Sequence, residues 1–261
     1  MTVYFIAVAL LLIFIGVLLA TYIYQHGAVF APSFYRDDDL LHTYPSQMQA
    51  MEIITDQNVR LEGIVYEPEN PDAKTILYFG GREQDSVGSI YKFAAALPHV
   101  RWVTFNYRGY GKSGDKPTEK KLLKDALQIT DTVEARYGKP SLMGFSLGAS
   151  IAAYAATKRP CEKLFLVAGF DSIASMAKSR YHFIIPFLIR YRFNTAAYVR
   201  HVNVPTYLFG AIDDKIIPIV HTRALKIEIK RLAAYNEYTG YDHNSLLLSQ
   251  GVMKTIEKAI R

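Results

Sequence analysis

Hydrophobic positions divide the chain into one long apolar segment near the N-terminus and a series of shorter runs after it. Residues 3–24 contain no charged side chain. As a helix rising about 1.5 Å per residue they extend roughly 33 Å, enough to cross a bilayer core of about 30 Å. A secretory signal would have a shorter apolar region after a basic start, and a core helix would show a polar stripe. We therefore expect a transmembrane anchor over 1–26 and a connector over 27–50.

Short apolar runs alternate with segments of helical spacing in the rest of the chain. The predicted strands are 51–55, 61–66, 75–79, 102–105, 141–145, 163–167, 206–209 and 233–238. Helical spacing covers 119–137 and an alanine-rich stretch at 147–157. Strands separated by helices imply βαβ units and a mostly parallel sheet. The pattern predicts one α/β domain over 51–261.

Composition changes this picture in two ways. Of the 261 residues, 50% are hydrophobic, which excludes a disordered chain. The single cysteine excludes an internal disulfide framework and a zinc site built mainly on thiolates. The sequence contains no metal-ligand pattern, so we expect neither a metal nor an organic cofactor.

The sharpest chemical signal is Gly144-Phe145-Ser146-Leu147-Gly148, which fits the pattern G-x-S-x-G between a strand and a helix. A sharp strand-to-helix turn needs small flanking residues and lifts the serine hydroxyl above the sheet. The start of the following helix directs free N–H groups, including that of Leu147, toward the same place. Ser146 is therefore the candidate nucleophile.

A serine nucleophile needs a general base, and histidine is the usual one. His201, His221 and His243 follow Ser146 in the sequence, and His182 is a weaker candidate. His243 lies in a polar, glycine-containing loop between the eighth predicted strand and the final helix. His201 precedes a strand at the wrong edge of the sheet, and His221 is expected on the surface of a helix. We select His243.

The acid that orients this histidine is expected after the seventh predicted strand, where two aspartates are adjacent. Counting back from Pro218 favours Asp214, whereas counting on from Gly210 favours Asp213. Neighbouring side chains in an extended segment point in opposite directions, so only one of the two should face the imidazole. We prefer Asp214 and keep Asp213 as the alternative.

The loop after the third predicted strand supplies a second candidate for binding an oxyanion. It reads Phe79-Gly80-Gly81-Arg82-Glu83, and a glycine pair lets the backbone approach a substrate closely. The backbone N–H of Gly81 or Arg82, together with that of Leu147, would stabilise negative charge on a carbonyl oxygen attacked by Ser146.

Several segments together resemble the α/β-hydrolase superfamily, in particular small membrane-anchored serine hydrolases such as protein depalmitoylases and monoacylglycerol-lipase-like enzymes. The resemblance spans about residues 50–260. Its segments are 144–148, Asn106-Tyr107-Arg108-Gly109-Tyr110-Gly111-Lys112-Ser113, Arg192-Phe193-Asn194 ahead of Val204-Pro205, and 240–244.

The resemblance implies an α/β-hydrolase fold, with a mostly parallel central sheet flanked by helices and a short cap inserted at about 170–200. It also implies the chain order nucleophile, acid, base, which Ser146, Asp214 or Asp213, and His243 satisfy. The family often has His-Gly-Asn-Ala-Gly after the third strand, and this chain departs from that pattern over 79–83.

The cap region concentrates the basic charge of the chain. Between Ser172 and Ile212 there are five basic residues and no acidic one, within a net charge of +6. Basic side chains among aromatic and aliphatic ones suit either a membrane interface or a solvated helical cap packed on the core. The candidate substrate or membrane contacts are Arg180, Phe183, Phe187, Arg190, Tyr191 and Arg192. Because the basic charge is confined to this apolar segment, we expect no nucleic-acid partner.

These observations predict a membrane-anchored serine hydrolase that cleaves an ester or thioester of a lipid or an acylated substrate. The alternatives are a non-catalytic, membrane-tethered binding module and a peptidase-type acyl hydrolase. The partners expected are the lipid bilayer and an acyl ester or thioester substrate. Only Arg36, beside three aspartates, lies near the apolar segment, so the side of the membrane stays open. The oligomeric state stays open as well.

Overall fold

The structure is a computed structural model that describes residues 1–33, 46–181 and 188–261, and its strands form one mixed sheet. The strands are β1 (Met48–Ile54), β2 (Arg60–Tyr66), β3 (Thr75–Phe79), β4 (Arg101–Phe105), β5 (Ser141–Phe145), β6 (Leu164–Val167), β7 (Thr206–Ala211) and β8 (Leu232–Tyr238). All eight predicted strands are therefore confirmed, with ends that differ by up to three residues.

The sheet has the spatial order β1-β2-β4-β3-β5-β6-β7-β8. The pairs β1–β2 and β2–β4 are antiparallel, and every pair from β4 to β8 is parallel. Every residue of β3, β5 and β6 is buried, which explains why these strands read as short continuous apolar runs. The prediction of a mostly parallel sheet is confirmed.

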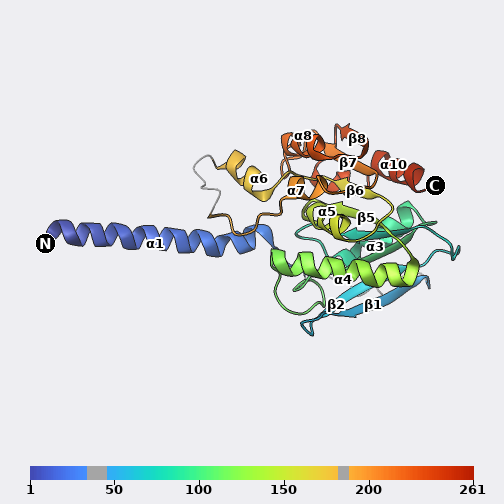
Figure 1. Cartoon of the computed structure of the whole chain (residues 1–261), viewed down its shortest axis with the longest axis horizontal. Helices are drawn as coiled ribbons and strands as arrows, with labels where there is room; N and C mark the ends of the chain where they lie inside the picture. Colours follow the sequence, from blue (N-terminus) through green and yellow to red (C-terminus); the bar gives the residue numbers. More distant parts are fainter. Residues whose placement is uncertain (34–45, 182–187) are drawn as a thin grey trace.

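Helices cover both faces of this sheet (Figure 1). The helices of the described chain are α1 (Thr2–Val29), which projects away from the sheet, α3 (Ser86–Ala96), α4 (Glu119–Tyr137), α5 (Leu147–Lys158), α6 (Ile173–Arg180), α7 (Thr195–Val199), α8 (Ile219–Glu228), α9 (His243–Leu246) and α10 (Gln250–Ile260). One core contains apolar residues of α4, α5 and α8, and a second contains those of α3 and α10. The domain is thus a three-layer α/β sandwich with the sheet in the middle.

Local signals explain why α4 forms where the helical spacing predicts it. The Thr118 side chain accepts a hydrogen bond from the Lys121 N–H at 3.3 Å and caps the first turn. Gly138 follows the last turn with a φ of 76°, a conformation in which glycine meets no steric penalty. The helix α3 was not predicted from the sequence; the Asp85 side chain caps its first turn by accepting from the Gly88 N–H at 3.0 Å.

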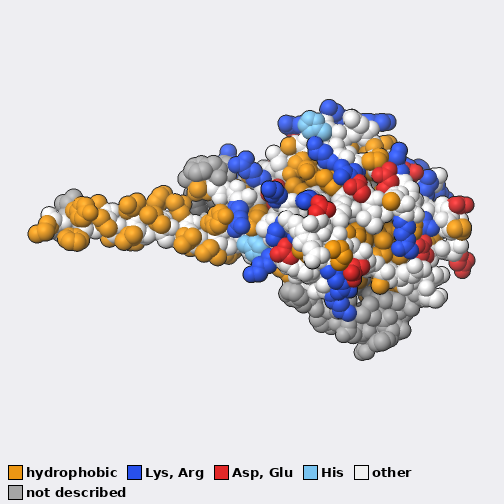
Figure 2. Space-filling model, turned by 60° about the horizontal axis from the view of Figure 1, so that its bottom comes forward, with side chains coloured by type: hydrophobic (Ala, Val, Ile, Leu, Met, Phe, Trp, Pro, Cys, Tyr) orange, Lys and Arg blue, Asp and Glu red, His pale blue; other side chains and the backbone are white. Residues whose placement is uncertain are grey.

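The N-terminal helix α1 projects from the α/β body as a separate rod (Figure 1). Residues Tyr4–Val29 are long and apolar enough to cross a membrane, with none of the most apolar window buried in the protein. Figure 2 shows this rod as an almost continuous hydrophobic surface, with Lys and Arg side chains where it meets the body. At its C-terminal end, Val29 and Phe30 are buried in the core of the domain.

Candidate active site

Ser146 occupies a strained turn between β5 and α5. Its φ of 53° is in the left-handed region, which a non-glycine residue rarely adopts. The flanking glycines are required by close backbone contacts. A Cβ at Gly144 would lie 2.2 Å from the Gly148 carbonyl oxygen, and a Cβ at Gly148 would lie 2.0 Å from that of Phe79. The G-x-S-x-G pattern therefore forms the predicted strand–turn–helix and holds Ser146 at the start of α5.

His243 begins α9 and is paired with one of the two candidate acids. Its Nδ1 lies 2.7 Å from Asp214 Oδ2, and both residues are buried. Asp214 Oδ1 also accepts hydrogen bonds from the N–H groups of Ile216 and Ile217, each at 2.8 Å. A carboxylate only accepts, so Nδ1 donates the proton and the lone pair of a neutral imidazole is on Nε2.

The adjacent aspartates point to different partners. Asp213 Oδ2 accepts a hydrogen bond from the Gly240 N–H at 2.8 Å and does not reach the imidazole. Phe145, next to the candidate nucleophile, has its ring 4.8 Å from that of His243. The structure thus brings His243 and Asp214 together beside the turn that holds Ser146, and Asp213 closes the histidine loop instead.

The loop after β3 lies against this turn. A Cβ built at Gly81 would be 3.7 Å from the Ser146 Cβ, so the Gly81 backbone passes close to the candidate nucleophile. The Gly81 N–H donates to Gln84 Oε1 at 3.1 Å, which leaves it engaged within the loop. The first N–H groups of α5, beginning with Leu147, have no acceptor within the helix.

Two buried tyrosines support the same loop from the segment after β4. The Tyr107 hydroxyl donates to the Gly80 carbonyl at 2.8 Å, and the Tyr110 hydroxyl donates to the Arg82 carbonyl at 2.6 Å. Burial raises the pKa of both phenols well above the usual value, so they stay protonated and keep donating. Sequence reasoning placed these tyrosines in a family-like segment but gave them no role. Their spacing in Asn-Tyr-Arg-Gly-Tyr after a buried strand is the signal that marks them.

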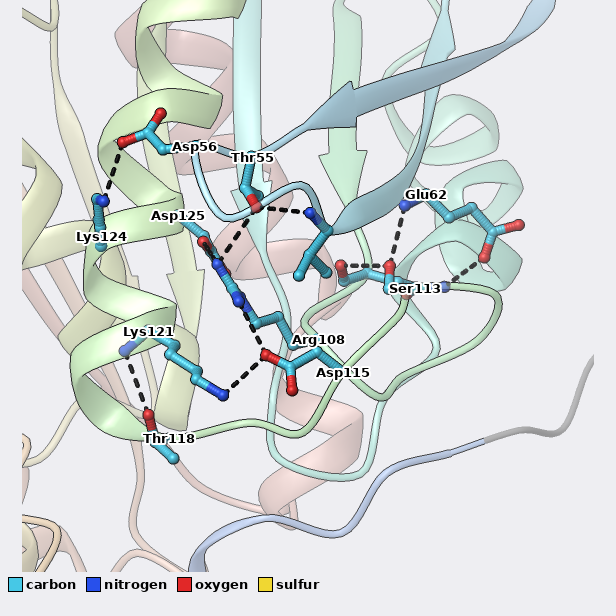
Figure 3. A network of polar contacts seen from close by, with 12 residues as sticks. Thr55, Asp56, Glu62, Arg108, Ser113, Asp115, Thr118, Lys121, Lys124 and Asp125 are labelled. Carbon is cyan, nitrogen blue, oxygen red and sulfur yellow. Dashed lines mark hydrogen bonds and ion pairs between the residues drawn. The ribbon is translucent and has the colours of Figure 1, made fainter.

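Arg108 fixes the segment that carries these tyrosines (Figure 3). It is 1% exposed and donates to both carboxylate oxygens of Asp125 at 2.7 Å, and to Asp115 Oδ2 at 2.9 Å. The hydrogen bond from Lys121, followed by that from Arg108, lowers the pKa of Asp115. A two-pronged guanidinium–carboxylate pair resists bending, so it ties this loop rigidly to α4.

A cavity of about 700 Å³ opens beside Ser146. Its lining residues are Tyr24, Gly27, Ala28, Val29, Arg82, Ser146, Leu147, Phe170, Ile173, Met176, Ala177, Ser179, Arg180, Tyr181, Lys215, Ile216, Ile217, Pro218 and His221. Within this described lining there are three Lys or Arg side chains and no Asp or Glu. Most of the wall is apolar, so the cavity combines a hydrophobic surface with positive charge.

Two lining residues of this cavity, Ser179 and His221, form a second group of serine, histidine and aspartate together with Asp171. His221 Nδ1 is 2.9 Å from Asp171 Oδ1, and His221 Nε2 is 2.9 Å from Ser179 Oγ. The expectation that His221 is a surface residue is wrong, since it is 4% exposed. It lies on the buried face of α8 together with Thr222 and Leu225. Nothing in the sequence pairs it with Asp171, because the pair arises only from the packing of α8 against the loop after β6.

The described cap residues face α1 and the cavity. Tyr191 is 3% exposed, with its hydroxyl 3.1 Å from His26 Nδ1. The Arg190 guanidinium lies 4.5 Å from the centre of the Tyr22 ring. The Arg192 N–H donates to Glu119 at 2.6 Å, and Arg180 lines the cavity. The remaining candidates, His182, Phe183 and Phe187, lie outside the described residues.

Across residues 1–33, 46–181 and 188–261, no group of three or more His, Cys, Asp or Glu side chains could hold a metal ion.

The order of the sheet and the strained serine turn are those of an α/β-hydrolase fold, and solved structures agree. The chain superposes on the Pyrococcus furiosus esterase Pf2001 with a TM-score of 0.66 over 88% of this chain and 95% of the other, at 16% identity. The esterase domain of a Rhodothermus marinus protein gives 0.61 over 82% and 96%, at 17% identity. The predicted fold class is therefore confirmed.

Curated relatives extend the likeness to the sequence. The lysophosphatidylserine lipase ABHD12 of Macaca fascicularis is 31% identical over 182 residues, covering 58% of this chain and 44% of that protein. Its Danio rerio counterpart is 30% identical over 55% of this chain and 44% of its own length. The chain thus spans less than half the length of these relatives. No protein-family model matches it. The predicted resemblance to the α/β-hydrolase superfamily is confirmed.

Proposed function

We propose that the protein is a membrane-anchored serine hydrolase that cleaves an acyl ester or thioester. The observation that carries the proposal is the buried His243–Asp214 pair, with a 2.7 Å hydrogen bond, next to a serine held at positive φ. Ser146 is the nucleophile, His243 the general base and Asp214 the orienting acid. The apolar helix α1 is the membrane anchor.

The reaction proceeds through an acyl-enzyme. Ser146 Oγ attacks the acyl carbonyl while His243 Nε2 takes its proton, and a tetrahedral oxyanion forms. The C–O or C–S bond to the leaving group then breaks, and His243 returns the proton to that group. A water molecule, activated by the same histidine, attacks the acyl-serine and releases the carboxylic acid with the free serine.

Two backbone N–H groups bind the oxyanion in this scheme. Leu147 provides one from the first turn of α5, where the partial positive charge of the helix also favours an anion. Because the Gly81 N–H already donates to Gln84, the Arg82 N–H is the donor from the loop after β3. Tyr110 and Tyr107 hold the carbonyls of that loop and keep this donor in position.

The cavity supports a lipid as the acyl donor. Its apolar wall suits a hydrocarbon chain, and Arg180 and Lys215 suit an anionic headgroup. The Arg82 guanidinium is instead engaged by Glu83 and the Ala28 carbonyl. The curated relatives carry the name lysophosphatidylserine lipase. Lysophosphatidylserine is a single-chain lipid with an anionic headgroup. We propose a lysophospholipid of this kind as the substrate class.

Labelling with a fluorophosphonate probe tests the nucleophile. Full-length protein in detergent should be labelled, whereas Ser146→Ala should not be. Ser150→Ala is the matched control, since Ser150 is a buried serine on the same helix, and it should be labelled like the wild type. Hydrolysis of lysophosphatidylserine should fall by at least about 10³-fold in Ser146→Ala. If the folded wild type is neither labelled nor active, the proposal is wrong and a binding module becomes the better interpretation.

A further inference from the structure

The last two turns of α1 are joined to the loop after β3. Arg82 Nη1 donates to the Ala28 carbonyl at 2.9 Å, at the C-terminal end of the helix where carbonyls lack intrahelical partners. In return, the Ala31 N–H donates to the Arg82 carbonyl at 3.3 Å. The helix end is thus bound to the residue whose N–H is the proposed oxyanion donor.

The cap binds the opposite side of the same turns. The Gln25 side chain accepts from the Arg190 N–H at 2.7 Å and donates to the Leu188 carbonyl at 3.0 Å. The Phe30 ring packs edge-on against Tyr191, with centroids 4.9 Å apart. These contacts fix the direction and rotation of α1 relative to the domain, which a flexible tether would not require.

The same turns form one wall of the cavity that holds Ser146. Tyr24, Gly27, Ala28 and Val29 line it from α1, opposite apolar side chains of α6. The cavity volume of about 700 Å³ lies within the range of about 300–1,000 Å³ found for small-molecule sites. The candidate nucleophile therefore shares a cavity with the end of the membrane helix.

The length of α1 places this wall at the membrane surface. Its 28 residues extend about 42 Å, roughly 12 Å more than the bilayer core. The excess corresponds to about eight residues, which are those from Tyr22 to the end of the helix. Tyr22 and Tyr24 are both exposed, as aromatic residues are in the interfacial belts of membrane proteins.

We infer that residues 22–30 form an acyl-chain site, in which the chain of a membrane-embedded single-chain lipid leaves the bilayer along α1 and passes Gly27 to reach Ser146. This inference rests on the proposed hydrolase function and adds where the acyl chain binds. The anchor is then part of the substrate site, and its role goes beyond holding the domain near lipid.

Gly27 offers a direct test. A Cβ at Gly27 meets no atom within 4 Å, so the side chain of Gly27→Phe starts in open space at the cavity wall. For the wild-type protein in nanodiscs, kcat/KM is measured on p-nitrophenyl palmitate and p-nitrophenyl butyrate. In Gly27→Phe we expect the palmitate value to fall at least about tenfold and the butyrate value to change less than about twofold.

Gly16→Phe is the matched control, because Gly16 is on the same helix, is equally free of neighbours and is outside the cavity. Both substitutions remove a glycine from a helix, so neither should prevent folding. Gly16→Phe should keep the wild-type ratio of palmitate to butyrate. An unchanged ratio in Gly27→Phe, in a protein that Ser146→Ala inactivates, would show that the chain does not pass α1.

A measurement that needs no turnover separates the two proposals. Ser146→Ala in nanodiscs is irradiated with a palmitic acid that carries a diazirine near its methyl end. We expect crosslinks on the peptide containing residues 22–30, and their loss in Ser146→Ala combined with Gly27→Phe. Crosslinks found only on peptides outside residues 22–30 would overturn the acyl-chain site, even if the wild type is an active hydrolase. Crosslinks at 22–30 in a protein without activity would retain the site and reject the proposed function.

Discussion

The protein holds two groups of serine, histidine and aspartate, whose serines Ser146 and Ser179 line one cavity. The histidine–aspartate hydrogen bonds of the two groups are nearly equal in length. His243 Nδ1 is 2.7 Å from Asp214, and His221 Nδ1 is 2.9 Å from Asp171. Both histidines are buried. The residue types and pair distances do not distinguish the groups, so the difference has to come from the elements that carry the serines.

Ser146 and Ser179 stand at opposite ends of their helices. Ser146 precedes α5, where free N–H groups and positive partial charge would stabilise an oxyanion. Ser179 is in the last turn of α6, among carbonyl groups that would repel one. Its hydroxyl lies 2.9 Å from both the Met176 carbonyl and His221 Nε2, so the carbonyl competes with the imidazole for the single hydroxyl proton. We therefore propose the first group for acyl transfer, and we propose that the second joins α6 to the domain.

The largest predicted contrast is between the two histidines. His243→Ala should lower kcat for lysophosphatidylserine hydrolysis by about 10⁴-fold or more, because no base remains for Ser146. His221→Ala should change kcat by less than about tenfold, since its loss affects only a wall of the cavity. Steady-state kinetics in detergent on both variants, with thermal unfolding as the folding control, gives the comparison. A larger loss in His221→Ala would reverse our assignment of the two groups.

The adjacent aspartates give the next largest effect. Asp214→Asn should lower kcat by about 10⁴-fold, because an amide at this position favours the wrong tautomer of His243. Asp213→Asn should stay within about threefold of the wild type, since an amide oxygen can still accept the hydrogen bond from Gly240. Equal losses in the two variants would mean that Asp213 also orients the histidine.

The sequence predicts the parts of the site that depend on residues close together in the chain. The turn around Ser146 follows from five consecutive residues between a strand and a helix, and His243 follows from its loop after the last strand. The choice between Asp213 and Asp214 did not follow, because it depends on which of two neighbouring side chains the turn after β7 directs toward α9. The pattern alone left both directions open.

Contacts between distant segments explain what the sequence could not give. Asp171 and His221 are 50 positions apart, and Arg82 is 54 positions from Ala28. Neither pair has a motif, since each depends on how helices pack on the finished sheet. The apolar composition of residues 3–24 predicted a helix of membrane-spanning length, and α1 is long and apolar enough to cross a membrane. It carried no sign that Val29 and Phe30 enter the core of the domain.

A smaller effect is expected on the free energy of unfolding when residues of the second group, Asp171 and Ser179, are changed. Asp171→Asn weakens a charge-assisted hydrogen bond to buried His221, so the free energy of unfolding should fall by about 1–3 kcal/mol. Ser179→Ala removes a neutral partner at the exposed end of α6 and should cost less than about 1 kcal/mol. Urea denaturation of each variant in the same detergent measures both values. A cost for Ser179→Ala equal to that for Asp171→Asn would mean that the whole group acts as one stabilising network.

The smallest effect is a dependence of this contribution on pH. Burial by itself would raise the pKa of Asp171, but hydrogen bonds from His221, Ser175 and the Ser172 N–H outweigh it and lower the pKa. A carboxyl whose pKa is lower in the folded state stabilises the protein above its unfolded pKa of about 3.9, and this stabilisation is lost as the pH falls toward the folded value. The difference in unfolding free energy between the wild type and Asp171→Asn should therefore be constant above about pH 5, more than about one unit above that unfolded pKa, and shrink below about pH 4. Urea titrations at about pH 5.5 and pH 3.5 test this, with Asp213→Asn as the surface control. A difference that grows on acidification would mean that the Asp171 carboxyl gains, rather than loses, stabilising contacts when it is protonated.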